Sequence, residues 1–446
     1  MSQVPLPADH PPGAPAPVAG QPDGGIALPA PAGWPSPLGP AAYHGLAGAI
    51  VQKIAPHSES DPIAILTQLL VCCGSVIGRG AYYQVEATRH HPNQFVLLVG
   101  DTAKARKGGS FDHVTRILTD TDPGFPQRVK TGLSSGEGLV WAARDPHGQD
   151  PGVADKRLLA VETEFVSVLK AATRDISTLS PTLRSAWDGR PLQLLTRTAP
   201  AKATAAHISL IGHITASELR RHTTTLEISN GLLNRVLIIA CRRVRLLPEG
   251  GDPEPLKHTG LLRYLAATLT HAQSAGQVRL DPQARELWWE NYPQLTEPGE
   301  GLAGQLTARA EAHSIRLALI YALLDGERQI QPAHLNAALA LWDYAQRSAA
   351  WALGQATGDP LAEQIHAALA RSPDGLTRTQ ISHHLQRNLP ASQLQHALYT
   401  LAAAGRAQPT KIATTGRPTE LWTATPPSHR APQRPADRSS GKDAAP

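Results

Sequence analysis

The sequence predicts an α/β fold with a mostly parallel sheet, followed by a separate small domain. Residues 95–99 form a short, wholly apolar run, and similar runs recur at residues 158–161, 208–211 and 236–240, with helical patterns between several of them. Such runs are typical of strands that are buried on both faces. Buried strands that alternate with helices predict a sheet covered by helices on both sides. We therefore expect an α/β core over residues 91–254.

The segments on either side of this core differ in composition. Residues 1–40 are dominated by Pro, Ala and Gly and lack a periodic apolar pattern, so we expect them to be disordered. Residues 41–90 and 255–353 carry apolar side chains at helical spacing, which predicts a helical segment before the core and a helical domain after it. Residues 425–446 are rich in Pro, Arg and Ser and are also expected to be disordered.

Length, cysteine content and charge limit the class of protein. A chain of 446 residues is long enough for two or three domains. Three cysteines without metal-binding spacing indicate a reducing cytoplasm, and we expect neither a membrane span nor a secretory leader. Residues 371–446 carry ten Lys and Arg against four Asp and Glu, and therefore more than account for the net charge of +5. A basic end on a nearly neutral body favours a polyanionic partner such as DNA, although a solvated basic tail is the alternative.

A loop rich in glycine and basic residues follows the first apolar run and leads into a helical pattern. This is the context in which backbone N–H groups and a lysine hold phosphate oxygens. The match to a phosphate loop is imperfect, because Arg106 replaces a glycine and Gly108 replaces the hydroxyl residue that binds Mg²⁺. A basic surface turn is the alternative interpretation. The predicted phosphate-binding residues are Gly100, Lys104, Arg106, Lys107, Gly108, Gly109 and Ser110.

Two acids follow the second apolar run, and side chains alternate along a strand, so Glu162 and Glu164 are expected on the same side. ATP hydrolysis needs one carboxylate that holds the hydrated Mg²⁺ and another that orients and deprotonates water. We predict Glu162 and Ser110 on the metal side and Glu164 as the base, with Glu137 as a rival base from another loop. An ordinary exposed strand end is the alternative.

Polar side chains near the other two apolar runs complete the predicted site. His213 follows residues 208–211, where a group that senses the γ-phosphate would lie in a parallel-sheet nucleotide-binding protein. Arg235 and Arg242 flank residues 236–240, and an arginine supplied to a neighbouring subunit can stabilise transition-state charge. A structural role is the alternative for each of the three.

Residues 358–424 predict a winged-helix domain, because three short helical patterns are followed by two β-like pieces around a turn. In such domains the third helix enters the major groove of DNA and the wing contacts the backbone. A protein-binding winged helix is the alternative. The predicted DNA contacts are Gln393, Gln395 and His396 in the third helix and Arg406, Lys411 and Arg417 in or beside the wing.

Six segments of the chain resemble the YfjI-like family of bacterial, phage and plasmid proteins. They are GDTAKARKGGS, GLSSGEGL, RLLAVETEF, LRSAWDG, HISLIGHIT and NGLLNR. The resemblance covers residues 35–355. It implies a RecA-like P-loop NTPase core of the helicase ATPases that serve plasmid and phage replication, often beside or fused to primase–polymerase modules.

The resemblance also implies roles for individual residues. Lys107 corresponds to the phosphate-loop lysine, Glu162 to the metal-side acid and Glu137 or Glu164 to the base. His213 resembles the sensor of hexameric plasmid helicases, and Arg235 or Arg242 the arginine finger. The resemblance leaves open whether identical subunits assemble into a ring.

Taken together, these patterns predict an ATP-dependent, DNA-associated motor with ATP and Mg²⁺ as cofactors and with DNA and a primase–polymerase as expected partners. The atypical phosphate loop leaves a second interpretation open: a replication initiator or regulator with a degenerate nucleotide-binding core and little or no hydrolysis. A defence or partition ATPase is a third.

Overall fold

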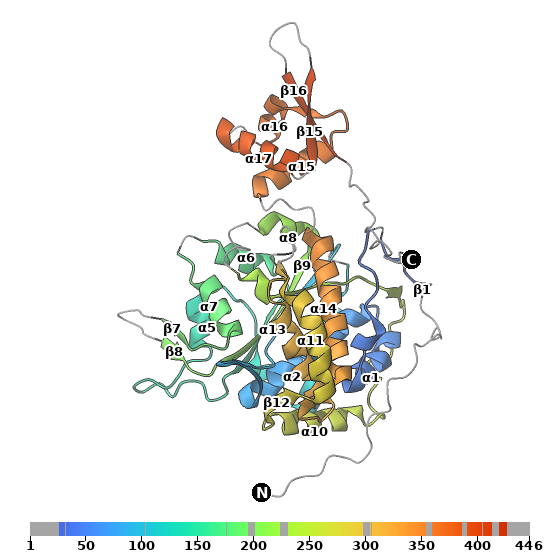
Figure 1. Cartoon of the computed structure of the whole chain (residues 1–446), viewed down its shortest axis with the longest axis vertical. Coiled ribbons are helices and arrows are strands. Elements are labelled where there is room, and N and C mark those ends of the chain that lie inside the picture. Colours follow the sequence, from blue (N-terminus) through green and yellow to red (C-terminus); the bar gives the residue numbers. More distant parts are fainter. Residues whose placement is uncertain are drawn as a thin grey trace, which may run out of the picture. The chain divides into compact units, whose positions relative to one another are not determined.

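The computed structural model describes residues 26–425 except 32, 103, 175, 195–200, 224–230, 298–303, 305, 354–358, 386–389, 404 and 413–418. The chain divides into two compact units, residues 1–360 and 361–446 (Figure 1).

A five-stranded, all-parallel sheet forms the centre of the first unit. Its strand order is β10, β4, β9, β6, β5, and each neighbouring pair is parallel. The predicted α/β core with a parallel sheet is therefore confirmed, and β5 is an addition to the four predicted strands. The bounds are β4 Phe95–Gly100, β5 Val129–Lys130, β6 Arg157–Glu162, β9 His207–Thr215 and β10 Leu237–Ala240.

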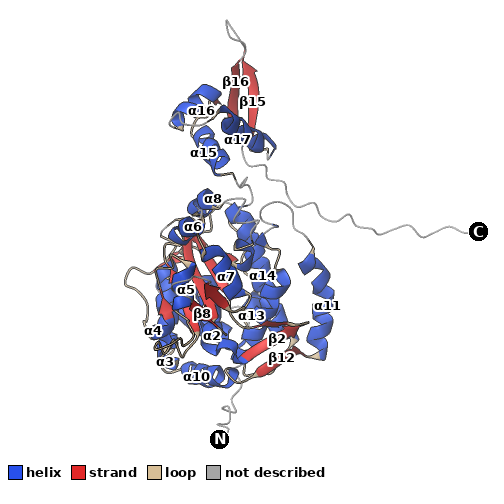
Figure 2. Cartoon of the chain, turned by 90° about the vertical axis from the view of Figure 1, so that its left-hand side faces the viewer, coloured by secondary structure: helices blue, strands red, loops and turns tan. Residues whose placement is uncertain are grey.

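Helices cover both faces of this sheet (Figure 2). Successive side chains of each strand point to opposite faces, and each face packs against helices in its own apolar cluster. On β4, Val96 and Leu98 join one cluster and Leu97 and Val99 the other. The first face is covered by α1 (Gly45–Ile54), α2 (Pro62–Ile77), α3 (Lys107–Thr121), α10 (Leu261–Ala272) and α13 (Ala310–Leu324). The second is covered by α5 (Gly136–Trp141), α6 (Val166–Ala172), α7 (Leu179–Trp187) and α8 (Ala216–His222), and α14 (Pro332–Leu353) contributes to both clusters.

One core joins the segments before and after residues 91–254. The first cluster contains side chains from α1 and α2, from the sheet, and from α10, α13 and α14. Residues 41–90 and 255–353 therefore pack as parts of one unit with the sheet.

Helix α2 is the most apolar element of the first unit. It begins with Asp61 as N-cap, whose side chain accepts the N–H of Ile63, and with Pro62 in its first turn. Residues Pro62–Gly80 are long and apolar enough to cross a membrane, but 89% of the stretch is buried in the fold. This burial is typical of a core helix.

A second, four-stranded sheet lies within regions that the sequence predicts as helical. Its order is β13, β12, β2, β3, with β12 parallel to β2 and β13, and β2 antiparallel to β3. The helical prediction is therefore wrong for these strands. They are β2 Ala81–Val85, β3 Thr88–His90, β12 Gly276–Leu280 and β13 Gln329–Ile330, and α11 (Pro282–Thr296) follows β12 directly (Figure 2).

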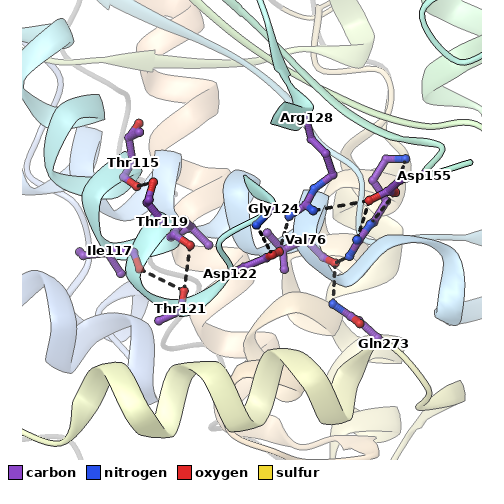
Figure 3. Close-up of polar contacts among 12 residues, drawn as sticks. Val76, Thr115, Ile117, Thr119, Thr121, Asp122, Gly124, Arg128, Asp155 and Gln273 are labelled. Atoms are coloured by element: carbon purple, nitrogen blue, oxygen red, sulfur yellow. Dashed lines mark hydrogen bonds and ion pairs between the residues drawn. The ribbon is translucent and has the colours of Figure 1, made fainter. Parts of the chain in front are cut away.

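Polar contacts fasten the start of β6 to the ends of three helices (Figure 3). Arg157 donates to the carbonyl of Val76, at the end of α2, at 2.7 Å, and Gln273 after α10 donates to the same carbonyl at 3.2 Å. The guanidinium of Arg157 also forms a two-point ion pair with Asp155. Arg128, which is buried, joins Asp155 to Asp122 at the end of α3.

The part of residues 1–40 that the structure describes is more ordered than its composition predicts. Strand β1 (Ile26–Ala27) pairs antiparallel with β11 (Arg245–Leu246), and the Trp34 ring lies 4.5 Å from that of Trp351 on α14. Backbone pairing and one aromatic contact therefore order a stretch that lacks apolar periodicity. The remaining short elements are β7 Leu192–Leu194, β8 Ala201–Ala203, α4 Phe125–Arg128 and the 3₁₀ turns Pro40–Ala42, Ala55–His57, Gly78–Gly80 and Leu233–Arg235.

The second unit contains three helices and a three-stranded antiparallel sheet of order β14, β16, β15. The three predicted helices and two predicted strands are present, and β14 was not predicted. Helix α16 begins with a capping box formed by Thr377 and Gln380. The bounds are α15 Pro360–Ala370, β14 Leu376–Thr377, α16 Arg378–His384, α17 Ala391–Ala403, β15 Ala407–Ile412 and β16 Thr419–Ala424.

Candidate functional site

The loop between β4 and α3 closes tightly over the side chain of Lys107. Lys107 begins α3, is only 9% exposed, and its ammonium lies 3.4 Å from the carbonyl oxygen of Thr102. A Cβ atom added to Gly100 would lie 2.7 Å from Lys107 Nζ and 2.7 Å from Ala105 Cβ. Glycine is therefore required at position 100 by the close approach of the loop.

Arg106, which stands where the phosphate-loop pattern has a glycine, adopts a left-handed backbone. Its φ is 57°, a region that glycine occupies readily and other residues rarely. Its half-exposed guanidinium pairs with the Glu59 carboxylate at 2.7 Å. The strained conformation and the ion pair together fix the point at which α3 begins.

Glu59 connects this loop to the chain that leaves β10. Its carboxylate binds Arg106, Arg243 and the N–H of Leu247. Burial alone would raise the pKa of Glu59, but the hydrogen bonds from Arg243 and Leu247 and the nearby positive charges lower it overall. The carboxylate therefore stays ionised and holds two arginines.

The other predicted phosphate-binding residues line the outside of the loop and the first turn of α3. Lys104 is exposed, and its backbone N–H donates to the Thr102 hydroxyl at 3.2 Å. Gly108 is exposed and Gly109 partly so, and a Cβ on Gly108 would meet nothing within 4 Å. These groups are open to a ligand on the solvent side of the loop.

A buried chain of hydrogen bonds links Ser110 to His213 across the first face of the sheet. The side-chain amide of Gln68, on α2, donates to Ser110 Oγ at 2.6 Å, and its oxygen lies 3.2 Å from His213 Nε2. Ser110 in turn donates to the carbonyl of Lys107 at 2.7 Å. Because Gln68 oxygen can only accept, the ring proton of neutral His213 lies on Nε2. The sequence did not single out Gln68.

The acid whose charge acts on Lys107 is Glu218. Burial lowers the pKa of Lys107 below its usual value, and the carboxylate of Glu218 opposes that shift. Glu218 forms a capping box with Thr215 at the start of α8, and Thr215 is paired with Gly100 in the sheet. The Thr215-x-x-Glu218 pattern directly after a predicted strand is the signal that could have pointed to it.

His213 shares the environment of Lys107. Burial, and then the positive charge of Lys107, lower the pKa of His213 from 6.5 to about 4. The ring is therefore neutral at pH 7 and serves as a hydrogen-bond donor to Gln68. The structure thus brings Lys107, Ser110 and His213 together, as predicted, and adds Gln68 and Glu218.

Glu162 lies apart from this group. It ends β6, and β9 separates β6 from β4, so the two strands are not neighbours as the predicted site required. Glu162 is paired with Gly212, which is level with Leu97, three residues before the end of β4. This register directs Glu162 to the second face of the sheet and His213 to the first. The Glu162 carboxylate is buried and accepts the N–H of Leu133 at 2.6 Å.

The two predicted bases occupy exposed positions. Strand β6 ends at Glu162, and Glu164 lies in the following turn, so strand alternation does not place the two acids on one side. The prediction that Glu162 and Glu164 share one side is therefore wrong, because the strand ends at Glu162, before Glu164. Glu137, on α5, accepts a hydrogen bond from the Thr178 hydroxyl at 2.7 Å, and this bond lowers the pKa of Glu137.

Arg235 and Arg242 lie at opposite ends of strand β10. Arg235 precedes β10, at the edge away from Lys107, where it is buried and pairs with Asp188 at 3.0 Å. Arg242 follows β10, at the same edge as Gly100, and donates to the carbonyls of Leu28 and Pro29. Both guanidinium groups are engaged within their own chain.

The predicted metal ligands do not fit one Mg²⁺ site as they stand. The Ser110 hydroxyl is fully buried between Gln68 and the carbonyl of Lys107, and Glu162 faces the other side of the sheet. We therefore derive no catalytic step through a metal ion.

A second cluster, His44, Asp325 and His334, places three possible ligand atoms within 4.8 Å of one another. The backbone N–H of Gln331 donates to His334 Nδ1 at 3.0 Å, so the ring proton lies on Nε2, which faces Asp325 at 3.3 Å. His44 Nε2 lies 2.9 Å from the same carboxylate. The cluster is a hydrogen-bonded network around Asp325, in which His334 has no lone pair directed at a metal.

The predicted DNA contacts of the second unit divide into two groups. Gln393, Gln395 and His396 are exposed on α17. Arg406 is 9% exposed and pairs with Glu363 on α15 at 2.5 Å, so it serves the interior of the unit rather than its surface. Lys411 belongs to β15, and Arg417 lies outside the described residues.

Comparison with protein-family models gives no match for this chain, and comparison with curated proteins gives none either.

Proposed function

We propose that this chain is an ATP-dependent, DNA-associated motor of the helicase-like class, which acts in the replication of a plasmid, phage or integrative element. The observation that carries the proposal is the loop between β4 and α3, which folds over a buried lysine at the carboxyl edge of a parallel sheet. Ligands of open α/β sheets bind at this edge, and phosphates bind at the start of the helix that follows.

The lysine environment supports phosphate as the ligand. Lys107 is largely buried, so its positive charge lacks full solvation, and a phosphate oxygen is a better partner than the carbonyl of Thr102 at 3.4 Å. The exposed N–H groups of Gly108 and Gly109 and the side chain of Lys104 are available to further oxygens. ATP is the proposed ligand, and the resemblance to the YfjI-like family remains part of this proposal.

Residues around the lysine supply candidates for the reaction itself. The carboxylate of Glu218 acts electrostatically on Lys107 and raises the pKa of its ammonium against the effect of burial. Neutral His213 is joined to the first turn of α3 through hydrogen bonds of Gln68 and Ser110. We assign Glu218 to the polarisation of the attacking water and His213 to sensing of the bound phosphate. A rearrangement of the 131–135 loop, which binds Glu162 through Leu133, would be needed before Glu162 contributes.

The second unit supports an association with DNA. Its order of helix, strand, helix, helix, strand, strand, with the antiparallel sheet β14, β16, β15, supports a winged helix as the fold of this unit. The exposed Gln393, Gln395 and His396 on α17 are the proposed base-reading residues, with Lys411 and Arg417 on the wing. A ring of subunits and a primase–polymerase partner belong to the same proposal.

Titration with a fluorescent ATP analogue tests the proposed site. Lys107→Ala should weaken binding at least about tenfold, because it removes a charge-assisted hydrogen bond. Lys53→Ala is the matched control, since Lys53 is an exposed lysine in the last turn of α1, outside the loop, and it should leave the affinity unchanged. Equal affinities of the two variants, both like the unmodified chain, would reject the site.

A second candidate is a nucleotide-binding replication regulator that hydrolyses ATP slowly or not at all. The inward hydroxyl of Ser110 and the separation of Glu162 from Lys107 favour it. Phosphate release with and without single-stranded DNA separates the two candidates. ATP binding without DNA-stimulated turnover, together with intact duplex binding, supports the regulator.

A further inference from the structure

The outer face of the small sheet carries basic, amide and aromatic side chains. On each strand alternate residues point away from the core, and the cross-strand pairs Tyr82–Gln277, Gln84–Arg89 and Arg279–Gln329 share this outer face. The strands β2, β3, β12 and β13 contain no Asp or Glu. We call the set Tyr82, Gln84, Arg89, Gln277, Arg279 and Gln329 the outer face.

Helix α11 borders this face with a stripe of aromatic and basic residues. Arg285, Trp288, Trp289 and Tyr292 are spaced so that they share one side of the helix. The indole of Trp289 is 67% exposed, which is unusual for so large an apolar side chain. Glu286 and Glu290 lie roughly opposite Trp288. Glu286 is three positions before Trp289, so it borders the stripe on the Trp289 side.

A pocket of about 480 Å³ lies between α11 and the strands β2 and β12, and the core-facing residues Tyr83, Val278 and Leu280 line it together with residues of the outer face. Its lining includes Gln277 and Arg279 from β12 together with Arg285, Trp288 and Trp289 from α11. The exposed Arg89 lies over the Tyr82 ring, 4.5 Å from its centroid. Flat rings and guanidinium planes are thus placed beside side chains that donate and accept hydrogen bonds.

We propose that the outer face and the α11 stripe bind single-stranded DNA, with a base stacked on Trp289 and phosphates held by Arg279 and Arg285. Aromatic rings within a basic groove are what single-stranded nucleic acids require, because every base has a stackable face and every phosphate a negative charge. A duplex hides the faces of its bases, so it cannot use the indole. The choice of DNA over RNA rests on the proposed function, whereas the surface itself does not depend on the nucleotide site.

The experiment measures fluorescence anisotropy of labelled oligo(dT), about 15 nucleotides long, with the full-length chain and without ATP. An excess of unlabelled duplex occupies the second unit. Trp289→Ala should weaken binding at least about fivefold, the lower limit for loss of one stacked base. The double variant Arg279→Gln, Arg285→Gln should lower the slope of log K against log salt by about 1.4, or about 0.7 for each phosphate that is no longer neutralised.

Trp141→Ala is the matched control, because Trp141 is also an exposed tryptophan, here beneath Arg144, but it lies on α5. It should leave the oligo(dT) affinity unchanged. Thermal unfolding checks that the exposed substitutions leave the fold intact. Lys107→Ala should bind oligo(dT) normally, so failure of the nucleotide site and failure of this surface give different results.

Three outcomes would overturn the assignment. One is normal oligo(dT) binding by both the Trp289 variant and the double arginine variant. Another is an equal loss of binding in the Trp141 control. The third is tighter binding of oligo(U) than of oligo(dT), which would reject DNA as the occupant.

Discussion

The side-chain amide of Gln68 donates to the hydroxyl of Ser110 at 2.6 Å, inside the core between α2 and α3. Both side chains are fully buried, and the Gln68 oxygen also accepts from His213. One glutamine therefore holds two polar partners that have no access to water.

Gln68→Leu should destabilise the first unit by about 2–4 kcal/mol, because it leaves Ser110 and His213 with unsatisfied hydrogen-bonding groups. Thr67→Val is the matched control in the same helix, since Thr67 is equally buried but bonds only to the preceding turn, at the carbonyl of Ile63. It should cost about 1 kcal/mol or less. Urea unfolding measures both, and equal losses would contradict a special role for Gln68.

The stability of the first unit should fall as the solution is acidified from pH 6.5 toward pH 4. The pKa of His213 is lowered to about 4 in the folded chain, so the unfolded chain binds the proton more readily between these values. The contribution of neutral His213 to the free energy of unfolding is fully present above pH 6.5. It is lost as the pH falls to 4, by roughly 3 kcal/mol in total. His91 and His207 shift in the same direction, with pKa values lowered to about 4 and about 3.

The contribution of His213 is isolated by His213→Gln, which cannot titrate. The dependence of unfolding free energy on pH between 6.5 and 4 should become shallower by up to one proton in this variant. An unchanged slope would show that His213 is not the neutral, buried ring described above.

Gly100→Ala should disturb the phosphate loop, whereas Gly108→Ala should not. The added methyl at position 100 would press on Ala105 and the Lys107 ammonium, which costs about 1–3 kcal/mol and displaces the lysine. At position 108 nothing lies within 4 Å, and alanine in a helix is worth up to about 1 kcal/mol over glycine. Binding of the fluorescent ATP analogue and thermal unfolding should both separate the two variants.

Substitutions of Arg106 should reveal the strain in its backbone. Arg106→Gly and Arg106→Val both remove the ion pair with Glu59, so their difference reports the left-handed conformation at φ 57°. The valine variant should be less stable than the glycine variant by about 1–2 kcal/mol. Equal unfolding midpoints in urea would mean that the loop relaxes to another conformation.

In the second unit, Arg406→Ala should lower stability by about 1–3 kcal/mol, because the largely buried guanidinium of Arg406 and its ion pair with Glu363 are lost. Gln395→Ala, on the exposed side of α17, should leave stability unchanged and weaken duplex binding. Circular dichroism melting and an anisotropy titration with duplex DNA check the two effects. Loss of duplex affinity in an Arg406 variant that remains fully folded would restore Arg406 as a DNA contact.

The sequence predicts four strands of the central sheet because each contains a short run of mostly apolar residues. It does not predict the small sheet, where outward Gln277 and Arg279 alternate with inward Val278 and Leu280 beside helical patterns. A strand of only five residues with this alternation is easily assigned to the amphipathic helix that is predicted beside it.

The candidate site is predicted in part for a similar reason. Lys107 and His213 follow strands and are found by their position along the chain. Strand order is not encoded locally, so nothing in the sequence shows that β9 separates Glu162 from the lysine. Gln68 and Glu59 join the site through contacts that span 42 and 184 residues, and no local pattern announces such contacts.

The carboxylate of Glu59 links the loop before α3 to the strand that pairs with residues 26–27. It binds Arg106 on one side, and on the other it binds Arg243 and Leu247, which flank the strand that pairs with residues 26–27. A ligand that draws Arg106 from Glu59 loosens that anchor, and by thermodynamic reciprocity removal of the terminal strand alters the affinity of the ligand by the same factor. Removal of the residues before 28 would thus change ligand affinity at the loop before α3, some 75 positions away in the chain.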